Sequence, residues 1–171
     1  MTTSPRRSLD GRAISASSVE NGDALLNETA QYAIAQLCEY LENLPPYRVR
    51  SGSVLCPMRK LQLRREMKKI PWPVPVAEAT EALSELAYME DSIAGLLGWK
   101  KDMKLAWVGA TLKTNILIGS DTRAEAAWFE NLIQEHNNKM AEAGLELRCW
   151  QTSSGYVTEF RTIMLLCFSL K

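Results

Sequence analysis

The stretch LAWVGATLKTNILIG, residues 105–119, decides the fold class. Its apolar residues, such as Val108 and Leu112, alternate with polar residues such as Thr111 and Lys113. Alternation over this length is typical of a long strand with one buried face. We therefore expect at least one antiparallel sheet in the domain.

The segments after this strand predict a helix and a hairpin. Thr122 and Glu125 have the spacing of a capping box, and Gly144 is a natural helix end, so we expect a helix over 122–143. LELRCW and YVTEFRTIMLLCFSL then read as two strands joined by a turn at TSSG, residues 152–155.

The segments before the strand predict two more helices. Apolar residues recur at helical spacing from Asp23, a plausible N-cap, to the stop at Pro45-Pro46, and again over 76–97 up to Gly98. Between the helices, YRVRSGSVLC reads as an extended segment broken at a glycine, and GWKKDMK after the second helix reads as a loop. We predict an α+β fold, a small antiparallel sheet packed against helices. Residues 1–20 form a flexible N-terminal tail, and 21–171 form a single domain.

The charge distribution is uneven in a chain whose formal net charge is zero. RKLQLRREMKK, residues 59–69, holds six cations and one carboxylate, whereas residues 76–98 hold five acids and no base. Residues 59–69 fit a strand better than a helix, since their apolar residues would form only a thin helical stripe. Three prolines at positions 71, 73 and 75 then enforce an extended crossing that exposes Trp72 or docks it.

Two interpretations of this cation cluster remain open. Basic side chains can simply keep an edge strand soluble, or they can form a docking site for an anionic surface. For the docking site we select these cations: Arg59, Lys60, Arg64, Arg65, Lys68, Lys69, Lys100, Lys101 and Lys104. A basic segment and an acidic helix can also pair between copies of the chain. The residues of that possible interface are Trp72, Glu78, Glu81 and Glu85.

The sequence contains no recognisable catalytic motif, and we expect a protein that is not an enzyme. His136, the only histidine, shares a helix face with apolar residues and reads as a hydrogen-bonded core-edge imidazole rather than a general base. The four cysteines show no paired spacing, so we expect buried, reduced thiols in strands and neither a metal nor a cofactor. The longest fully apolar run, residues 163–168, is too short to span a bilayer, and the N-terminus lacks the apolar core of a secretory signal.

The C-terminal half resembles the core of rhabdovirus matrix proteins, in particular the short, plant-infecting type. The resemblance covers 105–158 and is carried by GATLKTNILIG, by AEAAWFENL in the helix, and by AGLELRCW followed by SSGYV in the hairpin. It implies a structural protein of the virion that self-associates, condenses the helical nucleocapsid and bridges it peripherally to the envelope during budding.

The resemblance also implies partners and a location. The partners are the viral nucleocapsid (nucleoprotein with RNA), the acidic inner leaflet of the membrane, other copies of the chain and the viral glycoprotein tail. The protein would lie in the virion beneath the envelope, and in the cytoplasm and on the membranes of the host. Basic residues near the N-terminus contribute to membrane binding in that family, which maps onto Arg6, Arg7, Arg12 and residues 59–69. The alternative is a nucleic-acid-binding accessory protein, such as a viral RNA-silencing suppressor, in which Trp72 and the basic segment would contact RNA.

Overall fold

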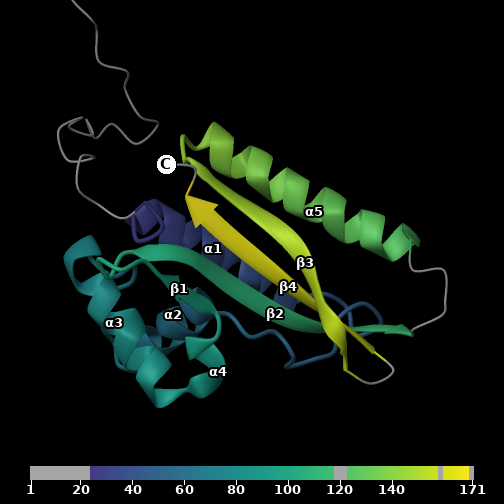
Figure 1. Cartoon of the computed structure of the whole chain (residues 1–171), viewed down its shortest axis with the longest axis horizontal. Coiled ribbons are helices and arrows are strands. Elements are labelled where there is room, and N and C mark those ends of the chain that lie inside the picture. Colours follow the sequence, from purple (N-terminus) through teal and green to yellow (C-terminus); the bar gives the residue numbers. More distant parts are fainter. Residues whose placement is uncertain (1–23, 118–122, 158–159, 170–171) are drawn as a thin grey trace, which may run out of the picture.

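The computed structural model describes residues 24–117, 123–157 and 160–169 (Figure 1). The predicted tail, Asp23 and Thr122 lie outside these residues. The described elements are α1 (Glu28–Glu42), α2 (Pro57–Met67), α3 (Val76–Met89), α4 (Asp91–Ala94), β1 (Leu97–Trp99), β2 (Leu105–Leu117), α5 (Arg123–Glu142), β3 (Leu147–Val157) and β4 (Phe160–Ser169). The predicted α+β class is confirmed.

The strands form one antiparallel sheet in the order β1-β2-β4-β3. The long strand β2 lies inside the sheet, as Figure 1 shows, with β4 along one side. Its other side is shared between the short β1 and two bridges from the segment before α2, Val49 to Thr114 and Leu55 to Thr111. The sheet therefore ties the N-terminal part of the chain to the C-terminal hairpin.

The helices and one face of the sheet enclose a single hydrophobic core. Val108, Ala110 and Leu112 alternate along β2 and are at most 5% exposed. They belong to one cluster with buried residues of the helices, including Ile34, Leu37 and Leu41 of α1, Met58 and Leu61 of α2, Leu83 and Leu86 of α3, and Phe129, Ile133 and Met140 of α5. Each fully buried apolar side chain contributes roughly 1.5–3 kcal/mol. The alternation in β2 thus orients the sheet, with a buried inner face and an outer face on the opposite side.

The prediction of a strand over residues 59–69 is wrong, because they belong to α2. Pro57 occupies the first turn of the helix, where its missing N–H costs nothing. The helix ends in a Schellman motif: the N–H of Ile70 donates to the carbonyl of Arg65, and the N–H of Lys69 donates to the carbonyl of Glu66. Lys69, at φ 55°, takes the left-handed position that usually belongs to glycine, so the sequence carries no visible stop signal.

The second predicted helix, 76–97, is shorter and broken. α3 ends at Met89, Glu90 is extended, and the single turn of α4 follows. Gly98 does not terminate a helix, because it lies in β1 opposite Trp107. A Cβ at Gly98 would lie 2.0 Å from the indole nitrogen of Trp107, so only glycine allows this pairing.

The predicted turn at TSSG is also wrong. β3 runs through residues 152–155 to Val157, and its pairing with β4 shifts register between Ser153 and Tyr156. Such an irregularity places an unpaired residue in one strand and increases its twist. The hairpin is therefore longer than the sequence predicted.

The outer edge of β3 is covered at Cys149 by a side chain from α5. The amide of Asn137 donates to the carbonyl of Cys149 at 2.9 Å and accepts from its N–H at 2.8 Å. These are the two bonds that a further strand would make at this point. Blocking them is a known way to prevent edge-to-edge pairing of sheets.

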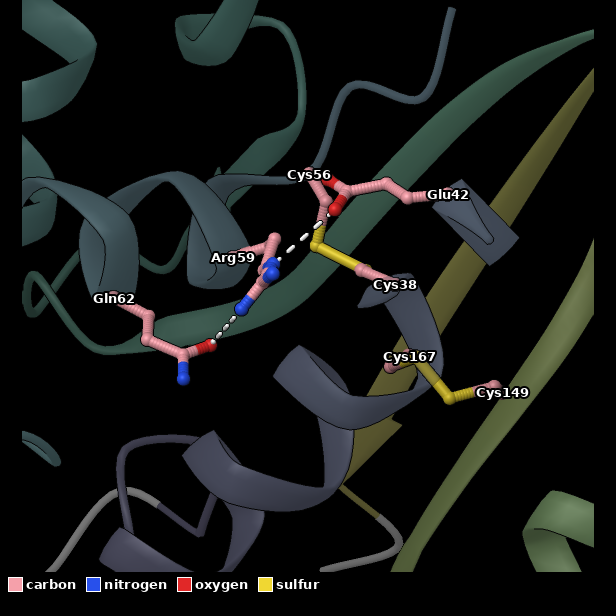
Figure 2. Close-up of a disulfide and its surroundings, with 7 residues drawn as sticks. All are labelled: Cys38, Glu42, Cys56, Arg59, Gln62, Cys149 and Cys167. Carbon is pink, nitrogen blue, oxygen red and sulfur yellow. Dashed lines mark hydrogen bonds and ion pairs between the residues drawn. A yellow bond between two sulfur atoms is a disulfide. The ribbon is translucent and has the colours of Figure 1, made fainter. Parts of the chain in front are cut away.

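The prediction of four reduced cysteines is wrong, since they form two disulfides (Figure 2). Cys38 of α1 bonds to Cys56, the residue before α2, and Cys149 bonds to Cys167 across β3 and β4. All four are at most 4% exposed. This pairing was not predicted, because each bridge joins cysteines from two different segments of the fold, 18 residues apart in both cases.

Candidate functional site

Arg59 is part of an internal ion-pair network. Its guanidinium donates to Glu39 at 3.0 Å and to Glu42 at 3.2 Å, both on α1, and to Gln62 at 3.0 Å. Figure 2 shows the bonds to Glu42 and Gln62 beside the Cys38–Cys56 disulfide. The side chain of Arg59 is only 14% exposed. It therefore holds α2 against α1 and is not available to an external anion.

Two more cations of α2 pair with the acidic side of the molecule. Lys60 pairs with Glu90, and Arg64 donates to Glu85 of α3 at 3.0 Å and contacts the sulfur of Met89. The predicted basic segment and acidic helix thus pair within one chain. Pairing of the same groups between copies would require these contacts to break.

Three cations at the end of α2 remain outside these pairs. Lys68 and Lys69 are exposed and make no ion pair within the described residues, and the Nε of Arg65 donates to the carbonyl of Pro71 at 2.7 Å. Three apolar side chains are exposed in the same short stretch: Leu63 at 38%, Met67 at 78% and Ile70 at 40%. We call these six residues, Leu63, Arg65, Met67, Lys68, Lys69 and Ile70, the α2 tip.

The second predicted basic cluster lies in the turn between β1 and β2. Lys100 and Lys101 are exposed, and Lys104 pairs with Asp102 at 3.4 Å in a surface contact. Exposed pairs of this kind contribute little to stability. Within the part of the chain described here, Lys100 and Lys101 are therefore exposed and have no carboxylate partner. They are the two such cations, of the nine selected, that lie outside the α2 tip.

Trp72 is docked rather than exposed. Its ring meets Tyr32 edge-on at a centroid distance of 6.4 Å, and it packs against the core. The buried side chain of Gln31 fixes this crossing, because its amide donates to the carbonyl of Val74 at 2.7 Å and accepts from the Val74 N–H at 3.0 Å. Stacking of Trp72 on a nucleobase would need this arrangement to open.

Glu78 and Glu81 remain exposed on α3, whereas Glu85 pairs with Arg64. Two of the three predicted interface carboxylates are therefore accessible to an external cation.

A groove of about 400 Å³ lies between α1 and α5. Apolar residues such as Leu37 and Leu132 line it together with Tyr32, Tyr40 and His136. Burial, and secondarily the charge of Lys139, lowers the pKa of His136 to about 4, so its imidazole is neutral near pH 7. Its Nε2 is buried without a hydrogen-bond partner in the described part of the chain. The predicted position at the core edge agrees with this, whereas the predicted hydrogen bond is not formed at Nε2 within the described residues.

The groove does not assemble a catalytic constellation among the residues described. Glu135, the carboxylate that lines it, pairs with Lys139 at 2.8 Å, and this hydrogen bond and charge lower its pKa. The four cysteines are closed in disulfides, so none can serve as a nucleophile beside His136. No group of three metal-ligating side chains occurs within residues 24–117, 123–157 and 160–169.

The outer face of the sheet holds residues that sequence reasoning overlooked. Trp107, Leu166 and Trp150 lie on it, separate from the core cluster, and Trp150 is 44% exposed. Lys113 and Arg148 are exposed on the same face. The signal was present in the alternation of β2, whose outward positions hold Trp107, Thr111 and Lys113; we used that alternation only to find the core.

No protein family, curated protein or solved structure matches this chain. The similarity to rhabdovirus matrix proteins therefore stays a prediction. Within the described residues, no helix has both the length and the apolar character needed to cross a bilayer.

Proposed function

We propose that this chain is a structural, non-enzymatic viral matrix protein that binds acidic membranes peripherally, associates with itself and condenses the nucleocapsid. The α2 tip carries the proposal. It combines three exposed apolar side chains with Arg65, Lys68 and Lys69. A mixture of exposed apolar and cationic groups is what a peripheral contact with an anionic leaflet requires.

The energies fit reversible binding. Each Lys or Arg near an anionic membrane surface contributes about 1 kcal/mol, so three give about 3 kcal/mol. Insertion of Met67, which is 78% exposed, adds apolar burial. Arg59, Lys60 and Arg64 no longer belong to this surface, because they pair with carboxylates of the same chain. Lys100 and Lys101 stay in the proposal as a second contact.

The two disulfides support a location in the virion. Disulfides persist in oxidising surroundings, which include virions, and are rare in the cytosol. Cys38–Cys56 also fixes the start of α2, which positions the α2 tip at the other end of the helix. A protein synthesised in host cytoplasm would form these bonds on or after budding.

The test is co-sedimentation of the purified protein with phosphatidylserine-containing vesicles at low salt. Replacing two cations, Lys68→Gln with Lys69→Gln, removes about 2 kcal/mol and should lower the partition coefficient roughly ten- to thirty-fold. Met67→Ser should lower it further without changing charge. The fold should be unaffected, because none of these side chains packs in the core.

The matched control is Lys113→Gln with Arg148→Gln, which removes the same charge from the outer face of the sheet. Vesicle binding by this variant should stay close to that of the unmodified protein. An equal loss in both double variants would show that net charge, and not the α2 tip, drives binding. Absence of binding by the unmodified protein at low salt would remove the membrane from the proposal.

A further inference from the structure

We propose that the outer face of the sheet binds single-stranded RNA, at a site separate from the α2 tip. The residues of this site are Trp107, Gly109, Thr111 and Lys113 of β2, Leu166 of β4, and Arg148 and Trp150 of β3. We call them the sheet platform. The site is independent of the membrane contact described above and can succeed or fail without it.

The strand register places these residues in adjacent rows. Trp150 of β3 is opposite Leu166 of β4, which is opposite Gly109 of β2. In the next row on this face, two residues further along β4, Arg148 of β3 and Trp107 of β2 lie on either side of β4. Strands lie about 4.8 Å apart and rise about 3.4 Å per residue, so Trp107 and Trp150 stand about 12 Å apart on one surface.

The indole of Trp107 lies against the sheet over glycines. A Cβ at Gly98 would come within 2.0 to 2.4 Å of three atoms of its pyrrole ring, and a Cβ at Gly109 would lie 3.4 Å from Cζ3 of its benzo ring. The two glycines thus leave room for the ring to lie down on the backbone. Trp107 is partly exposed, so part of its ring is accessible on the outer face. This is the geometry of a base-stacking platform.

All charged residues in the sequences of the four strands are positively charged. Their sequences contain three cations, Lys113, Arg148 and Arg161, and no aspartate or glutamate. Lys113 and Arg148 are exposed and make no ion pair within the described residues. A further cation, Arg50, lies beside β2: it is exposed, and its backbone N–H donates to the carbonyl of Lys113 at 2.8 Å. A polyanion is the complementary partner.

Single-stranded RNA fits this surface better than a membrane or a second copy does. A membrane contact needs exposed aliphatic side chains, but here Leu166 is half-buried and Thr111 and glycine lie beside it. A second copy could present carboxylates, since Glu78 and Glu81 are exposed although Glu85 and Glu90 are paired with α2, but carboxylates would pair only with the cations and would leave the two indole rings unused. Aromatic rings on an open antiparallel sheet, with cations at the rim, are how several modules hold unpaired bases.

The experiment is fluorescence anisotropy of a labelled oligouridine of about 15 nucleotides, titrated with the full chain. Trp150→Ala should raise Kd roughly ten- to 100-fold, the usual loss for one stacked base. Trp150→Phe should restore most of the binding and Trp150→Leu should not, because leucine keeps apolar area but offers no ring for stacking. Circular dichroism melts of all three report whether each variant is folded.

The salt dependence gives a second, independent readout. Each phosphate contact on a single strand contributes about −0.7 to the slope of log affinity against log salt. Lys113→Gln with Arg148→Gln should therefore make the slope shallower by about 1.4. The matched control, Lys68→Gln with Lys69→Gln on the α2 tip, should leave the slope and the RNA affinity unchanged.

Three results would overturn the inference. The first is an unchanged Kd for Trp150→Ala in a folded protein. The second is equal binding of Trp150→Phe and Trp150→Leu, which would indicate simple apolar contact. The third is a loss of vesicle binding or of self-association, rather than RNA binding, in the Lys113/Arg148 variant. Since the α2 tip variants are scored on vesicles and the sheet variants on RNA, failure of one proposal is distinguishable from failure of the other.

Discussion

The helix α2 and the outer face of the sheet make opposite use of their charge. α2 lies in the most basic stretch of the chain, yet Arg59, Lys60 and Arg64 are paired with carboxylates of α1, α3 and the residue after α3. The described outer face has few cations, Lys113 and Arg148, and both are unpaired within the described residues. The density of charge along a sequence therefore does not measure the charge that a partner can reach. The charge that a partner can reach depends on which carboxylates the fold places beside each cation.

Removing each disulfide in turn should have the largest effect on stability, and the two removals should affect α2 and the sheet differently. A bridge between residues 18 apart stabilises a protein by about 3 kcal/mol through the entropy of the unfolded chain. Cys38→Ala with Cys56→Ala should also release α2, since this helix buries only Pro57, Met58 and Leu61. Cys149→Ala with Cys167→Ala should leave the backbone pairing of β3 with β4 protected.

Hydrogen exchange and guanidinium unfolding of both double variants measure this difference. Exchange in 57–67 should rise selectively in the first variant. Equal exchange in α2 for both variants would mean that the ion pairs alone hold the helix.

Arg59→Gln should have the next largest effect, about 2 kcal/mol of stability, because Glu39 and Glu42 lose a partly buried cationic partner. Lys68→Gln removes the same charge from the opposite end of α2 and should change stability by less than about 0.5 kcal/mol. Chemical denaturation of the two variants gives the comparison directly. Similar losses would mean that the pairing of Arg59 contributes little, and that α2 could present its cations after all.

Acid should destabilise the groove between α1 and α5 through His136, by about 1 kcal/mol. Its pKa is about 4 in the folded protein and 6.5 when unperturbed, so the unfolded chain binds the proton first as pH falls. The contribution of the neutral imidazole to the free energy of unfolding is complete above pH 6.5. It is lost as the pH falls from 6.5 to about 4. We expect about 1 kcal/mol between pH 7 and pH 5, since part of the ring is exposed to solvent.

The control for this effect is His136→Gln, whose stability should fall less over the same range. Tyr32, Tyr40, Glu135 and Lys139 line the same groove and are unchanged in that variant. If the two proteins lose stability in parallel, the titration belongs to the carboxylates and not to His136.

Much of the secondary structure was predictable from periodicity. The strand over 105–119 and the helix over 122–143 agree with β2 and α5 within two residues, because long apolar patterns fix elements of this kind. α2 was not predictable, since its apolar stripe is thin, and the disulfide and ion pairs that hold it come from distant residues. Its end was hidden as well, because Lys69 stands where glycine is usual.

The candidate sites were likewise predictable only in part. Exposure of Lys68 and Lys69 agrees with a surface role, whereas the pairing of Arg59 with Glu39 spans 20 residues and leaves no trace in local sequence. The sheet platform depends on which side of β2 faces the helices, and on the glycines opposite and beside Trp107. Alternation marks two faces, but only the packed structure tells which of them lies against the helices.

The contact between Asn137 and Cys149 has a consequence for how copies of this protein can stack. Where a neighbouring molecule's backbone would have to dock, a carboxamide already occupies both bonding positions. A filament grown by adding one sheet to the next is thereby obstructed at that margin. Contacts between copies at this point have to be made by side chains, and polar contacts of that kind weaken when salt is added.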